Sequence, residues 1–275
     1  MLRPTSPNSI AHNYLTAAVL AAVLLIAELI TVARADPPAS QPAASNKPPV
    51  RVTISKETTW ITAPLREDGY PDYVRYLNEK LSQGVTPENN AMVPLVRAMG
   101  LNDLDEEIRN EYCKLLGIDR LPKDGDYFET WSSYTARTPE AEQPRVPPGD
   151  KRLQKDYFAQ RTKEAHARPW TRNEFPHVAK WLDRNEQHLD AIVAGSTLPR
   201  FFAPLIVAPD DQFGHSMLLS ALVVEVDFAR DAAQALCCRA MLRVACNDSQ
   251  SAASDLLAAH QLAAHLAEKP QLVNF

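Results

Sequence analysis

The apolar stretch from Tyr14 to Ala35, YLTAAVLAAVLLIAELITVARA, constrains this chain most, because it decides in which compartment the remaining residues fold. A polar leader with one basic side chain, Arg3, precedes it, and the small-residue sequence Ala33-Arg34-Ala35 ends it. That order is typical of a secretory signal peptide. The competing interpretation is a retained membrane anchor, since a helix of ~20 residues rising ~1.5 Å per residue crosses the ~30 Å hydrocarbon layer.

Glu28 weighs against permanent residence of this segment in a membrane, because an unpaired acid at the bilayer centre costs ~2.5–3.5 kcal/mol on insertion scales. Near one end of a span the cost is smaller, so a signal peptide and an anchor both stay open for residues 1–35. Under either interpretation the rest of the chain leaves the cytoplasm. We therefore expect an extracytoplasmic protein, periplasmic or in the cell envelope, that is membrane-anchored or secreted.

Composition separates a linker from a globular body. Residues 36–50 (DPPASQPAASNKPPV) form a Pro/Ala/Ser linker that cannot build a core and is expected to be disordered. Residues 51–275 suffice for one large or two small domains. Only 8 glycines occur in the chain, while alanine is frequent, which favours helix over sheet. The formal net charge of −5 offers no basic field for a nucleic acid, so we expect no such partner.

Helix signals divide the body into two lobes. Residues 51–137 form the predicted N-terminal helical lobe. Its helix boundaries are marked by the Asp72 cap, the Thr86-Pro87 start, the capping box Asp103–Glu106 and the Gly117 stop. Pro94 should bend the helix that contains it or split it. Residues 138–148 are rich in proline, which is typical of a hinge. In the C-terminal lobe, residues 149–275, we predict helices over Gly149–Arg168 and Phe175–Gly195 and a buried connection over Leu198–Val207.

The last part of the chain predicts an antiparallel helical hairpin. Asp211 to Cys246 can be helical almost throughout, and Asn247-Asp248-Ser249 forms a turn. Ser251 to Ala267 then repeats apolar residues at Ala252, Leu256, Ala259, Ala263 and Leu266. The predicted fold class is all-α, a helical bundle with this C-terminal hairpin, and a solenoid of helical repeats is the alternative. Pro270 could begin another helix just before the sequence stops, which predicts a shortened member of a longer architecture.

Four cysteines, Cys113, Cys237, Cys238 and Cys246, are too few for a disulfide-built scaffold of this length. On one helix, eight residues separate Cys246 from Cys238 by ~12 Å, which is too far for a bridge. We interpret the cysteines as small buried apolar residues. A bridge from Cys113 to the C-terminal region is the alternative.

Two segments carry a resemblance. Ile54 to Ala91 (ISKETTWITAPLREDGYPDYVRYLNEKLSQGVTPENNA) and Arg239 to Val273 (RAMLRVACNDSQSAASDLLAAHQLAAHLAEKPQLV) resemble a family of uncharacterised exported or membrane-anchored proteins from planctomycete bacteria. The resemblance implies export and a helical fold. It implies no catalytic residues, since the family has no assigned activity.

No motif for metal, nucleotide or nucleophilic chemistry is present: the sequence has no HExxH, GxSxG or Walker loop. We therefore expect no metal and no cofactor. The most turn-like polar cluster is the first place to look for a ligand, and it comprises Thr58, Thr59, Arg66, Asp68, Tyr70 and Asn89. Helix capping and turn formation explain the same residue types and are the favoured interpretation.

Two functions are compatible with these observations. The first is a structural or protein-interaction module that contacts a membrane through its N-terminal segment, at least during export, and binds a protein partner. The alternative is a small-ligand binder or hydrolase-like enzyme with a cleft between the lobes, walled by Trp60, Tyr70 and the region of Trp131.

Overall fold

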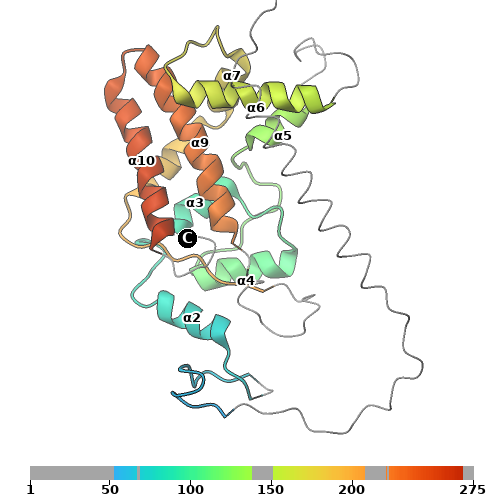
Figure 1. The fold of residues 1–275 in the computed structure, drawn as a ribbon, viewed down its shortest axis with the longest axis vertical. Helices are drawn as coiled ribbons and strands as arrows, with labels where there is room; N and C mark the ends of the chain where they lie inside the picture. Colours follow the sequence, from blue (N-terminus) through green and yellow to red (C-terminus); the bar gives the residue numbers. More distant parts are fainter. Residues whose placement is uncertain (1–52, 67–68, 138–150, 208–220, 222, 269–275) are drawn as a thin grey trace, which may run out of the picture. The chain divides into compact units, whose positions relative to one another are not determined.

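The computed structural model describes residues 53–66, 69–137, 151–207, 221 and 223–268, with backbone alone for 151–156. Within these ranges the regular structure is helical, apart from three isolated β-bridges, so the predicted all-α fold is confirmed (Figure 1). The helices are α2 (Tyr73–Leu81), α3 (Met92–Met99), α4 (Glu106–Leu116), α5 (Trp131–Arg137), α6 (Lys151–Ala167), α7 (Pro176–Arg184), α8 (Glu186–Ser196), α9 (Val224–Ala245) and α10 (Ser249–Ala267).

Several sequence predictions lie outside the described residues. They are the leader and linker (1–50), the hinge (138–148) and Asp68. Among the helices that the structure describes, none combines the length and apolar character that crossing a bilayer requires.

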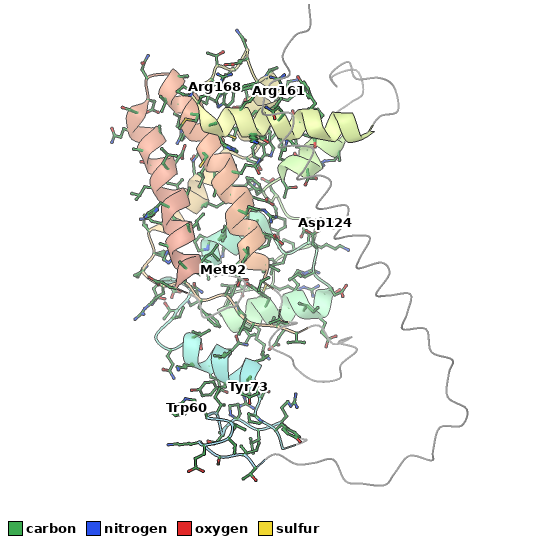
Figure 2. The ribbon with its side chains drawn as sticks, in the orientation of Figure 1. Trp60, Tyr73, Met92, Asp124, Arg161 and Arg168 are labelled. Atoms are coloured by element: carbon green, nitrogen blue, oxygen red, sulfur yellow. The ribbon has the colours of Figure 1, made fainter. Side chains whose placement is uncertain are left out.

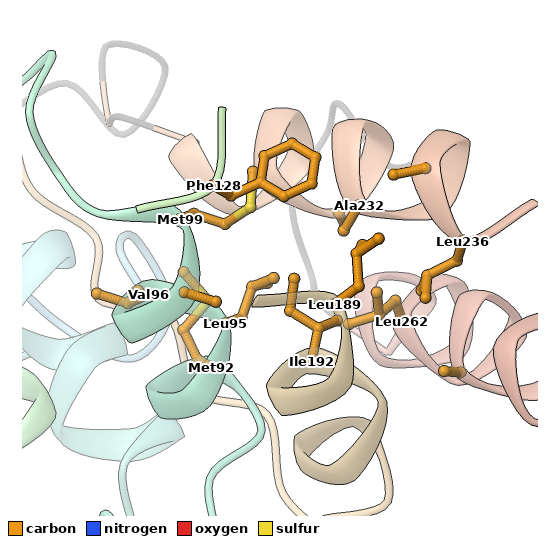
Figure 3. Packing of buried hydrophobic residues seen from close by; sticks show 14 of the residues in the cluster. Met92, Leu95, Val96, Met99, Phe128, Leu189, Ile192, Ala232, Leu236 and Leu262 are labelled. Carbon is orange, nitrogen blue, oxygen red and sulfur yellow. The ribbon is translucent and has the colours of Figure 1, made fainter. Parts of the chain in front are cut away.

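Helix α9 is the element around which the described body is built. It contacts α3, α6, α7, α8 and α10. Figure 3 shows the resulting core, in which Leu95 of α3, Ile192 of α8 and Leu262 of α10 are all buried. Helix α3 precedes the predicted hinge and α8 to α10 follow it, so residues from both sides of residues 138–148 contribute to one hydrophobic core.

The predicted C-terminal hairpin is present as α9 and α10, which pack side by side (Figure 1). Asn247 adopts a positive φ of 61° in the connecting turn, a conformation that asparagine tolerates better than most residues. The Asp248 side chain accepts a hydrogen bond from the Ser251 N–H at 3.1 Å and caps α10. The hairpin turn therefore falls where the polar residues predicted it, but α9 begins at Val224 and the described residues 221 and 223 are not helical.

The buried side of α10 differs from the predicted one. Leu256 and Ala263, members of the predicted apolar repeat, are exposed. The buried residues are Ala252, Asp255, Ala258 and Leu262. Alanine and leucine occur on every side of this helix, so apolar spacing does not select a face. The face is selected by Asp255, which is buried against arginines of α9.

The predicted single helix over Phe175–Gly195 is two helices, α7 and α8, which meet at Asn185. The Asn185 side chain is buried and bonds to the loop before α5: its Oδ1 accepts from the Glu129 N–H at 2.8 Å, and its Nδ2 donates to the Glu129 carbonyl at 3.0 Å. The same Nδ2 donates to the Trp181 carbonyl at 3.0 Å. An asparagine that competes in this way for backbone groups interrupts the helix.

Two helix starts in the N-terminal half also differ from prediction. Helix α3 begins at Met92 instead of Thr86, so Pro94 lies in its first turn, where proline needs no bend. Helix α4 has Asp105 as its N-cap, without a side-chain cap bond, in place of the predicted Asp103–Glu106 box. Gly117 ends α4 in the left-handed conformation as predicted.

The connection predicted to be buried over residues 198–207 is buried from 202 to 206, whereas Pro199 and Arg200 are exposed. Two asparagines hold the buried part. Asn78 pairs with both backbone groups of Leu205 at 2.8 Å, and Asn90 pairs with those of Phe202 at 2.9 and 3.0 Å. Both asparagines are almost fully buried. They replace the backbone partners that a strand would supply, which satisfies the polar groups of an apolar extended segment.

Candidate interaction surface

The predicted ligand residues Thr58 and Thr59 build one tight turn. Thr58 Oγ1 donates to the carbonyl of Thr53, and Thr59 Oγ1 lies 3.0 Å from the carbonyls of both Ser55 and Ile61. The Ile61 N–H donates to the Thr59 carbonyl at 2.6 Å, which closes a γ-turn around Trp60. The hydroxyls of both threonines thus serve local backbone geometry.

Trp60, predicted as a cleft wall, is held in solvent by that turn. Its φ is 58°, a conformation that bulky residues rarely adopt, and its side chain is 79% exposed (Figure 2). Trp131, the other predicted wall, is partly buried and packs against the core, stacked on Tyr134 at 5.5 Å and edge-on to Trp181 at 5.2 Å. Its Nε1 donates to the Phe158 carbonyl at 3.2 Å.

Turns also contain three further predicted site residues, Arg66, Tyr70 and Asn89. The Arg66 N–H donates to the Tyr70 carbonyl at 2.8 Å. Asn89 Oδ1 accepts from the Thr86 N–H at 2.8 Å, and its Nδ2 donates to the Gly84 carbonyl at 3.0 Å. These bonds favour the turn explanation of the polar cluster, while a ligand at Thr58, Thr59, Arg66, Asp68, Tyr70 and Asn89 stays a prediction.

The inner side of α10 carries a buried ionic network. Asp255, fully buried, accepts from Arg239 Nη2 at 2.6 Å and Nε at 3.1 Å, and from Arg243 Nη1 at 2.7 Å. Arg239 Nη1 also donates to Asp190 of α8 at 2.7 Å. Bidentate arginine–carboxylate bonds are strong and directional, so this network fixes how α10 is rotated against α9.

That rotation determines what α10 presents outward. With ~100° between successive residues of an α-helix, the exposed positions within about 60° of His260 define what we call the outer face. Its residues are Ser249, Ala253, Leu256, Leu257, His260, Ala263, Ala264 and Ala267. Leu256 and Leu257 are 40% and 55% exposed. The only carboxylate of α10, Asp255, is buried on the opposite side, and the helix contains no lysine or arginine.

An uncharged outer face is unusual for a helix that packs against a core on one side only. Helix α6, which also packs on α9, shows the common arrangement: Phe158, Thr162 and Ala165 are buried, whereas Gln160, Lys163 and His166 are exposed. Exposed contiguous apolar surface on a folded protein marks a site of contact with another molecule. The outer face of α10 is therefore the candidate interaction surface, and sequence periodicity missed it because two of its members were assigned to the core.

A second candidate is a set of buried polar groups on α4. Arg109 is 3% exposed and Tyr112 is fully buried, yet neither Arg109 Nε nor the Tyr112 hydroxyl has a hydrogen-bond partner among the described residues. Burial raises the pKa of Tyr112 well above its usual value, and the carboxylate of buried Glu225 adds to the shift. Buried polar groups normally have partners, so a polar ligand is one explanation of this set.

The thiols and histidines offer no metal site within the described ranges, where no group of three or more His, Cys, Asp or Glu side chains is placed to hold an ion. All four cysteines are free, so the alternative bridge from Cys113 is not formed. Cys113 and Cys238 are buried, as the packing interpretation predicted, whereas Cys246 is exposed. Burial raises the pKa of Cys238 to about 12, which keeps that thiol protonated and unreactive.

Comparisons of the chain with known protein families, with curated proteins and with solved structures gave no match.

Proposed function

We propose that this chain is an extracytoplasmic protein-interaction module that binds a partner through the outer face of α10. The observation that carries the proposal is the absence of any charged side chain from the exposed side of this 19-residue helix, where two leucines are accessible. Exposing such a face to water is unfavourable by ~25 cal/mol for each Å² of apolar surface. A partner that covers it recovers this free energy.

The proposed location depends on the sequence of residues 1–35. An apolar segment behind a weakly basic leader sends the body across a membrane, and the Pro/Ala/Ser linker separates the two. Membrane fractionation combined with N-terminal sequencing of the mature protein tests this part. Full-length, unprocessed chain in the soluble cytosolic fraction would contradict it.

A photo-crosslinking amino acid at position 257 of the full chain tests the interaction. We expect a discrete covalent adduct when the protein is illuminated in its host cells, because residue 257 lies on the outer face. The same amino acid at position 114, which is an exposed lysine on α4, is the matched control and should give none. Ala263→Glu should remove the adduct at 257, since it places a charge on the same face.

The alternative, a small-ligand binder, is favoured by the buried polar groups of α4. A thermal-shift screen of metabolites on the full chain tests it, because a ligand that binds only the folded state raises the unfolding temperature. A reproducible increase with one class of metabolite, lost in Arg109→Met, would support the ligand binder. No increase together with a 257-specific adduct supports the interaction module.

A further inference from the structure

Helix geometry places the residues of the outer face, apart from Ser249, at matched positions before and after His260. Ala253 and Ala267 lie seven residues on either side of it, Leu256 and Ala264 lie four residues away, and Leu257 and Ala263 lie three residues away. Three, four and seven are the separations that return to the same side of an α-helix. The positions match but the side-chain sizes do not: both leucines precede His260, and the residues that follow it on this face are all alanines.

This arrangement is complementary to itself when reversed. If a second α10 lies antiparallel across the first, with a two-fold axis at His260, residue 256 reaches the level of residue 264 of the other copy, and 257 reaches the level of 263. The pair Leu256–Leu257 of each copy then packs over the pair Ala263–Ala264 of the other. Large side chains set against small ones allow two helices to approach to ~8–10 Å, the usual interaxial distance.

We propose that the partner bound by the outer face of α10 is a second copy of this chain, in a two-fold antiparallel contact centred on His260. The proposal rests on the interaction function proposed above. A two-fold contact uses the same patch on both copies, so that patch must be complementary to itself. The outer face meets this requirement in size, and it meets it in charge because it contains no Asp, Glu, Lys or Arg.

Charge and size define the kind of dimer. Each chain carries a formal net charge of −5, so two copies repel each other at long range, and a contact that lacks charged side chains adds no further repulsion at short range. The face is one side of a 19-residue helix, ~28 Å long at ~1.5 Å per residue. A contact through one side of a single helix is smaller than the ~800 Å² per partner of a standard interface, which places the dimer among weak associations.

Oxidative cross-linking of the full chain in detergent micelles tests whether the two-fold axis of the dimer passes close to His260. His260→Cys places a thiol where the two copies meet, so we expect a disulfide-linked dimer on a non-reducing gel. Ser254→Cys is the matched control: residue 254 is also exposed on α10 but lies about 120° around the helix from His260 at ~100° per residue. The unsubstituted chain measures the background from exposed Cys246 and from the shared micelle. We expect the yield from His260→Cys to exceed both controls several-fold.

A second measurement separates association from folding. Ala263→Glu should weaken self-association at least tenfold in sedimentation equilibrium while circular dichroism stays unchanged, because residue 263 is exposed in the described body. Equal cross-linking at positions 254 and 260, or no change in association with Ala263→Glu, would overturn the dimer. An adduct at position 257 whose mass differs from twice that of the chain would overturn the second copy as partner but keep the interaction module. The absence of any adduct at 257 would overturn the proposed function itself.

Discussion

Helices α10 and α4 both bury groups that water would otherwise solvate, and they do so in opposite ways. On α10, the carboxylate of Asp255 accepts three hydrogen bonds from Arg239 and Arg243. On α4, Arg109 Nε and the Tyr112 hydroxyl are buried without hydrogen-bond partners among the described residues. The first arrangement gives α10 one rotation on α9. On α4, Arg109 Nε and the Tyr112 hydroxyl lose their contact with water and gain no hydrogen bond in return among the described residues.

The Asp255 network selects one packing of α10 among several that are similar in apolar burial. Alanine and leucine residues of α10 occur on all sides of the helix, so several rotations of α10 about its own axis would bury a similar apolar area. Only one of these rotations pairs Asp255 with Arg239 and Arg243. A buried ion pair of this kind adds little net stability compared with apolar residues, but it disfavours the alternatives. The outer face exists because this pairing leaves Leu256 and Leu257 outside.

The largest effect is expected from Asp255→Asn. The substitution leaves Arg239, whose side chain is 6% exposed, buried next to a neutral amide. Loss of one partner of a buried pair costs ~3–5 kcal/mol, so the free energy of unfolding should fall by that amount in urea titration. Asp190→Asn is the control, because that carboxylate is 61% exposed and its pair with Arg239 is partly solvated. A loss below about 1 kcal/mol for Asp255→Asn would remove the network as the determinant of rotation.

The next effect compares two buried arginines directly. Arg239→Met removes two of the three hydrogen bonds that buried Asp255 accepts and leaves it paired with Arg243 alone, so it should cost up to ~3–5 kcal/mol. Arg109→Met removes a cation that has no ion pair among the described residues and should be neutral or stabilising by ~1 kcal/mol. Chemical denaturation of both variants under one set of conditions measures the difference. Equal losses of unfolding free energy in the two variants would mean that Arg109 has a partner as strong as that of Arg239. That result would contradict the contrast between α4 and α10 and favour the ligand binder.

Sequence reasoning predicted the parts of this fold whose signals are local. Gly117, with its left-handed conformation, ends α4 where the glycine predicted it, and the Asn247-Asp248-Ser249 turn joins α9 to α10. The break at Asn185 was missed because it depends on Glu129, 56 residues away in the chain. The predicted buried side of α10 is wrong, because apolar residues occur on every side of this helix and their spacing selects none. The ion pairs of Asp255 select the buried side instead.

The candidate surface was missed for the same physical reason. Leu256 and Ala263 fit an apolar repeat, and only the pairing of Asp255 with Arg239 and Arg243 turns them outward. The two arginines are four residues apart, so they share one side of α9. A lone acid in an otherwise uncharged helix, preceded by such a pair of arginines, is a sequence signal that could have identified the buried side of α10.

The smallest effect at neutral pH is expected from Tyr112→Phe, which removes an unpartnered hydroxyl and keeps the ring. The unfolding free energy at pH 7 should change by less than about 1 kcal/mol.

Because burial raises the pKa of Tyr112 in the folded state, the unfolded chain loses this proton first as the pH rises above ~10. Folding stability should therefore fall above that pH, by up to ~1.4 kcal/mol per pH unit for this one group. Urea titrations between pH 9 and about pH 11 should show a shallower decline in Tyr112→Phe than in the unsubstituted chain. Tyr73→Phe, a change at an exposed phenol, controls for general alkaline effects. Identical declines in all three proteins would mean that the Tyr112 hydroxyl reaches water or a partner in solution, and the contrast between α4 and α10 would then rest on Arg109 alone.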